Sequence, residues 1–134
     1  MTIRTGARTG TALLAVVLAL AGCGGGTTNH AVITLGDTPR FAVAERQAAA
    51  DAIVAAFKSF RGCDLRALWY DEALTISEYG ADDPNGIVFL SEFHVNASGG
   101  DGSFNPNQTY TNWQWKLTRA APGATWTVVD WGQG

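Results

Sequence analysis

The spacing of apolar residues between positions 43 and 60 predicts one long helix. The composition is rich in alanine, which favours a helix, and one helix face would carry Ala49, Ile53, Ala56, Phe57 and Phe60. Arg61 and Gly62 follow as a stop, because a cation suits the negative end of a helix and glycine tolerates left-handed geometry. The start stays open: Thr38-Pro39 could cap the helix, or it could begin near Val43.

After Gly62 the pattern changes to the alternation typical of β-strands. Residues 63–70 form a first strand, whose inner side is expected to carry Cys63, Leu65, Ala67 and Trp69. Residues 71–79 fit a short helix or a turn, and further strands are expected at residues 87–95, 109–119 and 125–131. Residues 37–134 are therefore expected to form a single α+β domain, with one long N-terminal helix packed on an antiparallel sheet of about four strands.

Residues 1–22 have the layout of an export signal. Arg4 and Arg8 precede an uncharged run, residues 11–21, which is shorter than the roughly 20 apolar residues of a membrane-spanning helix. The run ends in Leu20-Ala21-Gly22-Cys23, which resembles the lipobox of bacterial lipoproteins. In that family the cysteine thiol receives a diacylglyceryl group with fatty acyl chains such as palmitate, and a peptidase cleaves just before the cysteine. The resemblance makes Cys23 the lipidated first residue of the mature chain. A cleaved signal followed by a chance cysteine is the alternative.

Lipidation of Cys23 would be sufficient to hold the protein at a membrane, because two acyl chains, at about 0.8 kcal/mol per buried methylene, give a stable anchor. Residues 23–36 are expected to form a flexible tether that begins with Gly and Thr and ends in a short β-prone patch, Val32–Leu35. The expected location is the cell membrane on its extracytoplasmic side. This is the outer leaflet of the plasma membrane or, in a Gram-negative cell, a position facing the periplasm.

The charge of the chain bears on its partners. The formal net charge is −3, and removing residues 1–22 takes away Arg4 and Arg8, so the mature chain is more acidic still. Nucleic acid is not an expected partner, because phosphate contacts need clustered Lys and Arg. No cofactor is expected. With Cys23 lipidated, Cys63 has no disulfide partner within the chain, so it is either a small buried hydrophobic residue or a reactive thiol.

Four stretches of the domain resemble an uncharacterised family of bacterial exported and lipid-anchored proteins. They are FRGCDLRALWYDE, SEFHV, GGDGSFNPNQTYTNWQWKLTR and WTVVDWG, and the resemblance covers most of residues 37–132. The order of elements in that family is similar to the cystatin-like and the nuclear-transport-factor-like folds, which are cone-shaped. The resemblance therefore implies a cystatin-like or cone-like fold, and it implies no activity.

Candidate ligand-binding residues come from the sheet face opposite the core. In residues 87–95 the odd positions are the more apolar, so Glu92 and His94 are expected on the other face. The strand at 109–119 would add Asn112, Gln114 and Lys116 to that face. Such a face is either a solvated sheet surface or a ligand-binding surface. Tyr70 and Asp71, at the end of the first strand, are further candidates.

Trp113 and Trp115 lie two residues apart on one strand and therefore share a face. Core packing is their expected use, because burial of such side chains supplies much of a small core. If they line an open concavity instead, they would suit a sugar, a peptide or a hydrophobic ligand.

The domain contains one histidine, His94, which an acid–base enzyme would pair with a carboxylate such as Asp71, Glu92 or Asp130. Zinc is not expected, because His-x-x-His and Cys-x-x-Cys motifs are missing from the sequence. The Asp-rich turns at residues 82–86 and 101–103 do not match the ligand spacing of an EF-hand. No catalytic residue and no metal site are assigned.

Two functions remain open. The preferred hypothesis is a membrane-anchored lipoprotein whose domain is a non-catalytic module that binds a small ligand or an envelope protein. The alternative is a small isomerase or hydrolase that uses His94 with a nearby carboxylate. An enclosed pocket with a carboxylate beside His94 would favour the enzyme, and a flat, solvent-facing His94 would exclude it.

Overall fold

The computed structural model describes residues 25–100 and 102–134, so the expected signal segment and Cys23 lie outside the described residues. In chain order the elements are β1 (Val32–Thr34), α2 (Val43–Phe57), β2 (Cys63–Tyr70), α3 (Glu72–Tyr79), β3 (Gly86–Val95), β4 (Thr109–Thr118) and β5 (Thr127–Gln133). α2 begins at Val43, which is the later of the two predicted starts.

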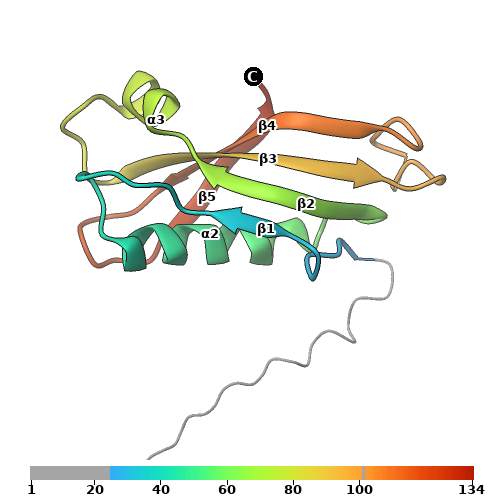
Figure 1. The fold of residues 1–134 in the computed structure, drawn as a ribbon, viewed down its shortest axis with the longest axis horizontal. Coiled ribbons are helices and arrows are strands. Elements are labelled where there is room, and N and C mark those ends of the chain that lie inside the picture. Colours follow the sequence, from blue (N-terminus) through green and yellow to red (C-terminus); the bar gives the residue numbers. More distant parts are fainter. Residues whose placement is uncertain (1–24, 101) are drawn as a thin grey trace, which may run out of the picture.

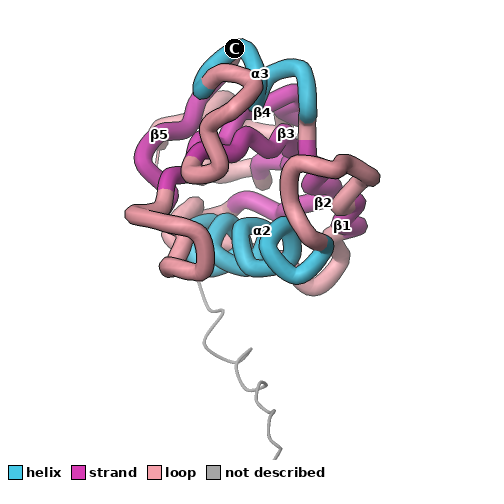
Figure 2. The backbone as a smooth tube through the Cα atoms, turned by 90° about the vertical axis from the view of Figure 1, so that its left-hand side faces the viewer, coloured by secondary structure: helices cyan, strands magenta, loops and turns pink. Residues whose placement is uncertain are grey.

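The strands form one sheet in the order β1-β2-β3-β4-β5. β1 runs parallel to β2, and each of the other neighbouring pairs is antiparallel. α2 covers one face of the sheet, and α3 lies on the opposite face (Figures 1 and 2). The fold is therefore α+β with a helix packed on a sheet, as predicted. The sheet is mixed and five-stranded, however, where about four antiparallel strands were expected.

The main core lies between α2 and the sheet. α2 contributes Ala49, Ala50, Ile53 and Phe57, each fully buried. The predicted inward residues of β3 and β4 are confirmed, since the buried set includes Ile87, Phe89, Phe93, Val95, Trp113, Trp115 and Leu117. Past the end of α2, the ring of Phe60 lies 5.3 Å from that of Trp115 and 5.8 Å from that of Phe93. Aromatic rings thus fill the core beyond the C-terminal end of α2.

The alternation predicted for β2 is wrong in its second half. A β-bulge between Leu65 and Ala67 adds one residue to this strand. Because side chains alternate with a period of two, an extra residue moves every later side chain to the other face. Leu68 and Tyr70 are therefore buried in the core, while Trp69, expected to face inward, belongs to the opposite face and is half-buried.

The segment expected to be a flexible tether contains a strand. Within the described part of residues 23–36, Val32–Thr34 forms β1 and pairs with Ala67–Trp69 of β2. Thr27 makes a further isolated bridge with Asp64. Strand pairing uses main-chain groups, which every residue except proline can supply in full, so the Gly-rich and Thr-rich composition does not prevent it.

α3 covers part of the sheet face that was expected to be polar. Thr75 is fully buried, and its hydroxyl accepts a hydrogen bond of 2.9 Å from the backbone N–H of Val88 on β3. Val88 and Leu90 are buried on this face. The Tyr79 ring lies so close to Gly86 that a Cβ built there would be 2.2 Å from it. The opposite face is thus divided between a helix-covered part and a polar part.

Candidate functional site

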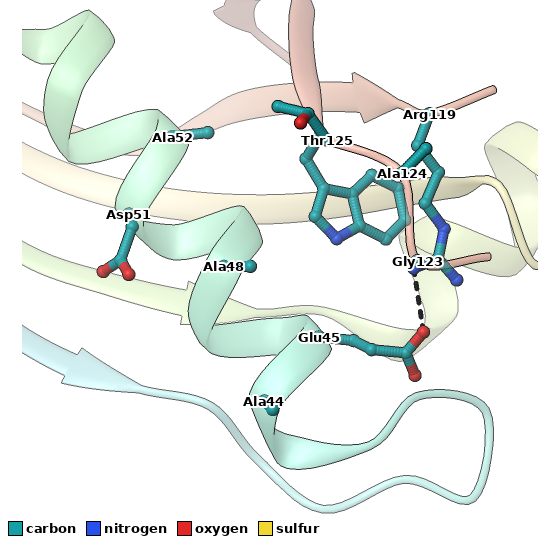
Figure 3. A pocket seen from close by; sticks show the side chains of 10 residues that line it. Ala44, Glu45, Ala48, Asp51, Ala52, Arg119, Gly123, Ala124 and Thr125 are labelled. Carbon is teal, nitrogen blue, oxygen red and sulfur yellow. Dashed lines mark ion pairs between the residues drawn. The ribbon is translucent and has the colours of Figure 1, made fainter. Parts of the chain in front are cut away.

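A groove of about 560 Å³ opens between the N-terminal half of α2 and the connection from β4 to β5 (Figure 3). We call it the α2 groove. Its lining residues are Ala44, Glu45, Ala48, Asp51, Ala52, Arg119, Gly123, Ala124, Thr125 and Trp126. This volume lies within the range of roughly 300–1,000 Å³ found for small-molecule sites.

The groove exists because three positions on α2 carry alanine. Ala44, Ala48 and Ala52 are four residues apart, so they lie one above the other on the same side of the helix. Methyl side chains leave open the space that larger side chains would occupy. The facing wall is the β4–β5 connection, including Gly123 and Ala124, so that wall also consists partly of small residues.

Arg119 fixes the wall of the groove opposite α2. Its side chain is only 3% exposed, and its Nη1 lies 2.8 Å from Oε2 of Glu45. Its Nε and Nη2 both donate to the carbonyl oxygen of Pro84, at 3.1 and 2.8 Å. The guanidinium carbon lies 4.3 Å from the centre of the Trp126 ring, which is cation–π geometry. Arg119 is therefore held on three sides by the protein itself.

Glu45 connects the start of α2 to this wall. Its Oε1 accepts a hydrogen bond of 2.8 Å from the backbone N–H of Ala42, the N-cap residue, which satisfies one N–H at the helix N-terminus. The backbone hydrogen bond from Ala42, followed by the hydrogen bond from Arg119, lowers the pKa of the Glu45 carboxyl below its usual value. Glu45 is thus a fixed anion at neutral pH, with both oxygens already bonded.

His94 lies on the polar part of the sheet face opposite the core. Its Nδ1 is 2.9 Å from Oγ1 of Thr109, in an exposed setting. Asp64 is its cross-strand partner on β2. The Asp64 carboxylate is bonded to Arg66 Nε at 2.7 Å and to Thr27 Oγ1 at 2.8 Å. Partial burial opposes ionisation of Asp64, but these bonds outweigh it and lower its pKa.

The other predicted polar candidates lie apart from the α2 groove. Asp71 is the N-cap of α3, and its carboxylate accepts a hydrogen bond from the backbone N–H of Leu74 at 2.8 Å. The Tyr70 hydroxyl donates to Oε1 of Glu72. Glu92 is half-buried on β3, opposite Ala67 of β2. The geometry gives Asp71 and Tyr70 structural partners and does not bring these three residues together.

The paired tryptophans pack in the core. Trp115 is fully buried, and its Nε1 donates to Oγ of Ser91 at 2.8 Å. Trp113 is 9% exposed, and its ring lies 5.3 Å from that of Phe93. Cys63 is buried as well. Trp113 and Trp115 therefore do not line the α2 groove.

Inspection of the sequence missed the groove residues. Ala48 and Ala52 were interpreted only through their helix propensity and Ala44 was not considered, although the spacing of four among these alanines is the signal for a shallow strip on one helix side. Arg119 and Trp126 flank a turn and show no local pattern. Their contact with α2 joins segments more than 70 residues apart in the sequence, so local patterns do not reveal it.

In the described part of the chain, no group of three or more His, Cys, Asp or Glu side chains is arranged to hold a metal ion. Among the described helices, none has the length and apolar character needed to cross a bilayer. Comparisons with known protein families, curated proteins and solved structures found no match to this chain.

Proposed function

We propose that the protein is a lipid-anchored module of the bacterial cell envelope whose domain binds a small, mainly apolar ligand in the α2 groove. The groove itself carries the proposal. It combines a volume suited to a small molecule with an apolar lining and fixed polar groups at one side.

The contacts in the groove favour an uncharged or amine-bearing ligand. The guanidinium N–H groups of Arg119 already bind the carbonyl oxygen of Pro84 and the carboxylate of Glu45, so Arg119 is not available to bind an anion. Glu45 is ionised, and the exposed Asp51 accepts a hydrogen bond of 2.8 Å from Gln47 with one carboxylate oxygen. Because Arg119 neutralises Glu45, the net charge of the lining residues is the carboxylate of Asp51, which repels anionic groups and attracts a cationic one.

The support for the lipid anchor comes from the sequence. The cationic start, the short apolar run and the tetrapeptide that ends in Cys23 together support lipidation at that residue and export to the extracytoplasmic side. The helix that packs across the sheet supports the resemblance to cystatin-like and cone-like folds, which carries no activity to this protein.

The alternative, an acid–base enzyme at His94, has less support. The hydrogen bond made by His94 is with a hydroxyl group, and Asp64, across from it, is already bonded to Arg66 and Thr27. His94 and Thr109 lie on an exposed part of the sheet, whereas proton transfer to a substrate needs a site that holds the substrate in position. We therefore favour the binding module.

The proposed binding site can be tested with N-phenylnaphthylamine, an uncharged apolar amine whose fluorescence rises in apolar surroundings. We expect the chain from residue 24 onward, which contains the whole described core, to enhance this fluorescence. Ala48→Phe should weaken binding about tenfold or more, a loss of roughly 1.4 kcal/mol, because the ring fills the groove.

The matched control is Ala55→Phe. Ala55 is also an exposed alanine of α2, but it does not line the groove, so this variant should bind the dye like the parent. If Ala48→Phe and Ala55→Phe bind equally well, the dye enters elsewhere and the α2 groove is not the site.

A further inference from the structure

The chain is fixed to the domain from Gly26 onward. The Gly26 N–H donates to the carbonyl oxygen of Lys58 at 3.0 Å, just after the end of α2, and the Thr27 N–H donates to that of Cys63 at 2.9 Å. The N–H of Leu65 in turn donates to the carbonyl oxygen of Thr27 at 2.9 Å. Gly26 is buried, and a Cβ there would lie 2.2 Å from the carbonyl oxygen of Phe57. Only glycine fits this close approach.

The docked position of Gly26 limits how far the domain can lie from a lipid on Cys23. Cys23 precedes Gly26 by three residues, and at 3.3–3.6 Å per residue such a segment spans at most about 10 Å. That is shorter than the reach of a flexible tether of some fifteen residues, which is roughly 20 Å. The end of the domain near Gly26 is therefore held close to the membrane surface.

This end of the domain, which we call the anchor end, contains the C-terminal end of α2 and the start of β2; Figure 1 shows it at the right. Lys58 and Arg61 are exposed here, and neither forms an ion pair with the described residues. The acidic residue described at this end, Asp64, is neutralised by Arg66 at 2.7 Å. Asp101 belongs to the same connection as Gly100 and lies outside the described residues.

The opposite end of the domain has the opposite charge. Three of its cations are paired: Arg40 with Glu72, Lys116 with Glu78 and Arg119 with Glu45. The fourth, Arg46, is buried and donates to the carbonyl oxygens of Leu35 and Gly36. The acidic residues at the start of α2, around α3 and in the loop before β3 are Asp37, Glu45, Asp71, Glu72, Glu78, Asp82 and Asp83. The domain thus presents unpaired cations at the anchor end and an acidic surface at the other.

We propose that the anchor end docks on an anionic phospholipid surface, with Lys58 and Arg61 against the lipid phosphates. The proposal deepens the proposed function and depends on the lipid at Cys23. Bacterial-type lipoproteins sit on bilayers whose anionic headgroups attract nearby Lys and Arg side chains, and the same field repels the acidic far end. The short link and the charge difference therefore favour the same orientation.

This orientation determines how far the α2 groove lies from the bilayer. The groove lies at the N-terminal half of α2, and a 15-residue helix is about 22 Å long. The groove is consequently held at the end of the domain away from the bilayer, where a ligand can reach it from the aqueous side.

The orientation can be measured with the full-length lipidated protein in vesicles of equimolar phosphatidylethanolamine and phosphatidylglycerol that carry a nitroxide on some headgroups. A nitrobenzoxadiazole label is placed on Ser59→Cys at the anchor end or on Ala121→Cys in the β4–β5 connection. Both positions are exposed. The parent chain, whose Cys63 is buried, measures the background labelling. We expect the headgroup nitroxide to quench the label at position 59 and to leave the label at position 121 bright.

Two further changes test whether the short link and the two cations produce this orientation. A ten-residue Gly-Ser insertion after Gly24, or the pair Lys58→Glu and Arg61→Glu, should reduce quenching at position 59 while the protein still floats with the vesicles. Equal quenching at positions 59 and 121 in vesicle-bound protein would overturn the orientation and leave the anchor intact. Failure of the parent protein to float with vesicles would overturn the anchor itself, and with it this proposal.

Discussion

Arg119 and Glu45 show how single residues hold the candidate site. Arg119 is almost completely buried and binds a carbonyl, a carboxylate and an aromatic face at once. Glu45 completes the helix cap and the ion pair with its two oxygens. The groove wall is therefore built from side chains whose hydrogen-bonding capacity is used internally, which keeps the groove in one shape.

The ionisation of Glu45 predicts a dependence of stability on pH. Its folded-state pKa lies below its ordinary value of 4.5, so its carboxylate stabilises the fold above that pH, and the contribution is lost as the pH falls through the lowered pKa. Glu45→Gln should cost about 1 kcal/mol at pH 7, as measured by urea unfolding. The difference between Glu45→Gln and the parent should shrink at pH values below 4.5. A difference that stays constant down to pH 3 would contradict the role given to Glu45.

At the scale of elements, α3 depends on one buried hydroxyl. Thr75 Oγ1 donates to the carbonyl oxygen of Asp71 at 2.7 Å and accepts from the N–H of Val88 at 2.9 Å. Thr75→Val keeps the shape but leaves the Val88 N–H buried without its partner, which should cost about 1–3 kcal/mol of unfolding free energy. Thr75→Ser keeps the oxygen and should cost less. Urea unfolding of both variants tests this, and equal losses would show that packing, not the hydrogen bond, holds α3.

The sequence predicted where the strands lie better than it predicted which face of the sheet each side chain occupies. Hydrophobic alternation located β3 and β4 and their inward residues, because the extra residue in their pairing lies in β4 before Trp113, which leaves β3 and residues 113–117 in regular alternation. It failed in β2, where a bulge between Leu65 and Ala67 reverses the side chains. Nothing in that stretch is glycine or proline, so no residue type marks the bulge. β1 was identified only as a β-prone patch at the end of a tether, because its three residues are exposed and their pairing uses main-chain groups.

The candidate site was less accessible to prediction than the fold. The residues proposed from the sequence were chosen for their chemical type, and the structure places three of them in the core: Tyr70, and also Trp113 and Trp115, for which core packing was the expected use. The α2 groove depends instead on small side chains on α2 and on a distant connection that passes in front of them. Such a site is defined by the space that residues leave open, which a linear pattern of residue types does not record.

At the scale of the whole molecule, the anchor end lies at the C-terminal end of α2, whereas the groove is lined by residues of its N-terminal half. In Figure 1 these are opposite ends of the helix. If Cys23 carries the proposed lipid, the close docking of Gly26 leaves only Gly24 and Gly25 between the lipidated residue and the docked chain. In the proposed orientation, the lipid-anchored protein would hold its groove at a set distance from the bilayer. Both proposals therefore depend on what is attached to Cys23.

Mass spectrometry of the full-length protein, expressed in a bacterial host and extracted from its membranes, tests that dependence most directly. We predict a mature chain that begins at Cys23 and carries a diacylglyceryl group on its thiol, with an unmodified Cys63 as the internal control. Cys23→Ser should yield no lipidated peptide. A mature chain that begins at any other residue, or an unmodified Cys23 thiol, would contradict the account.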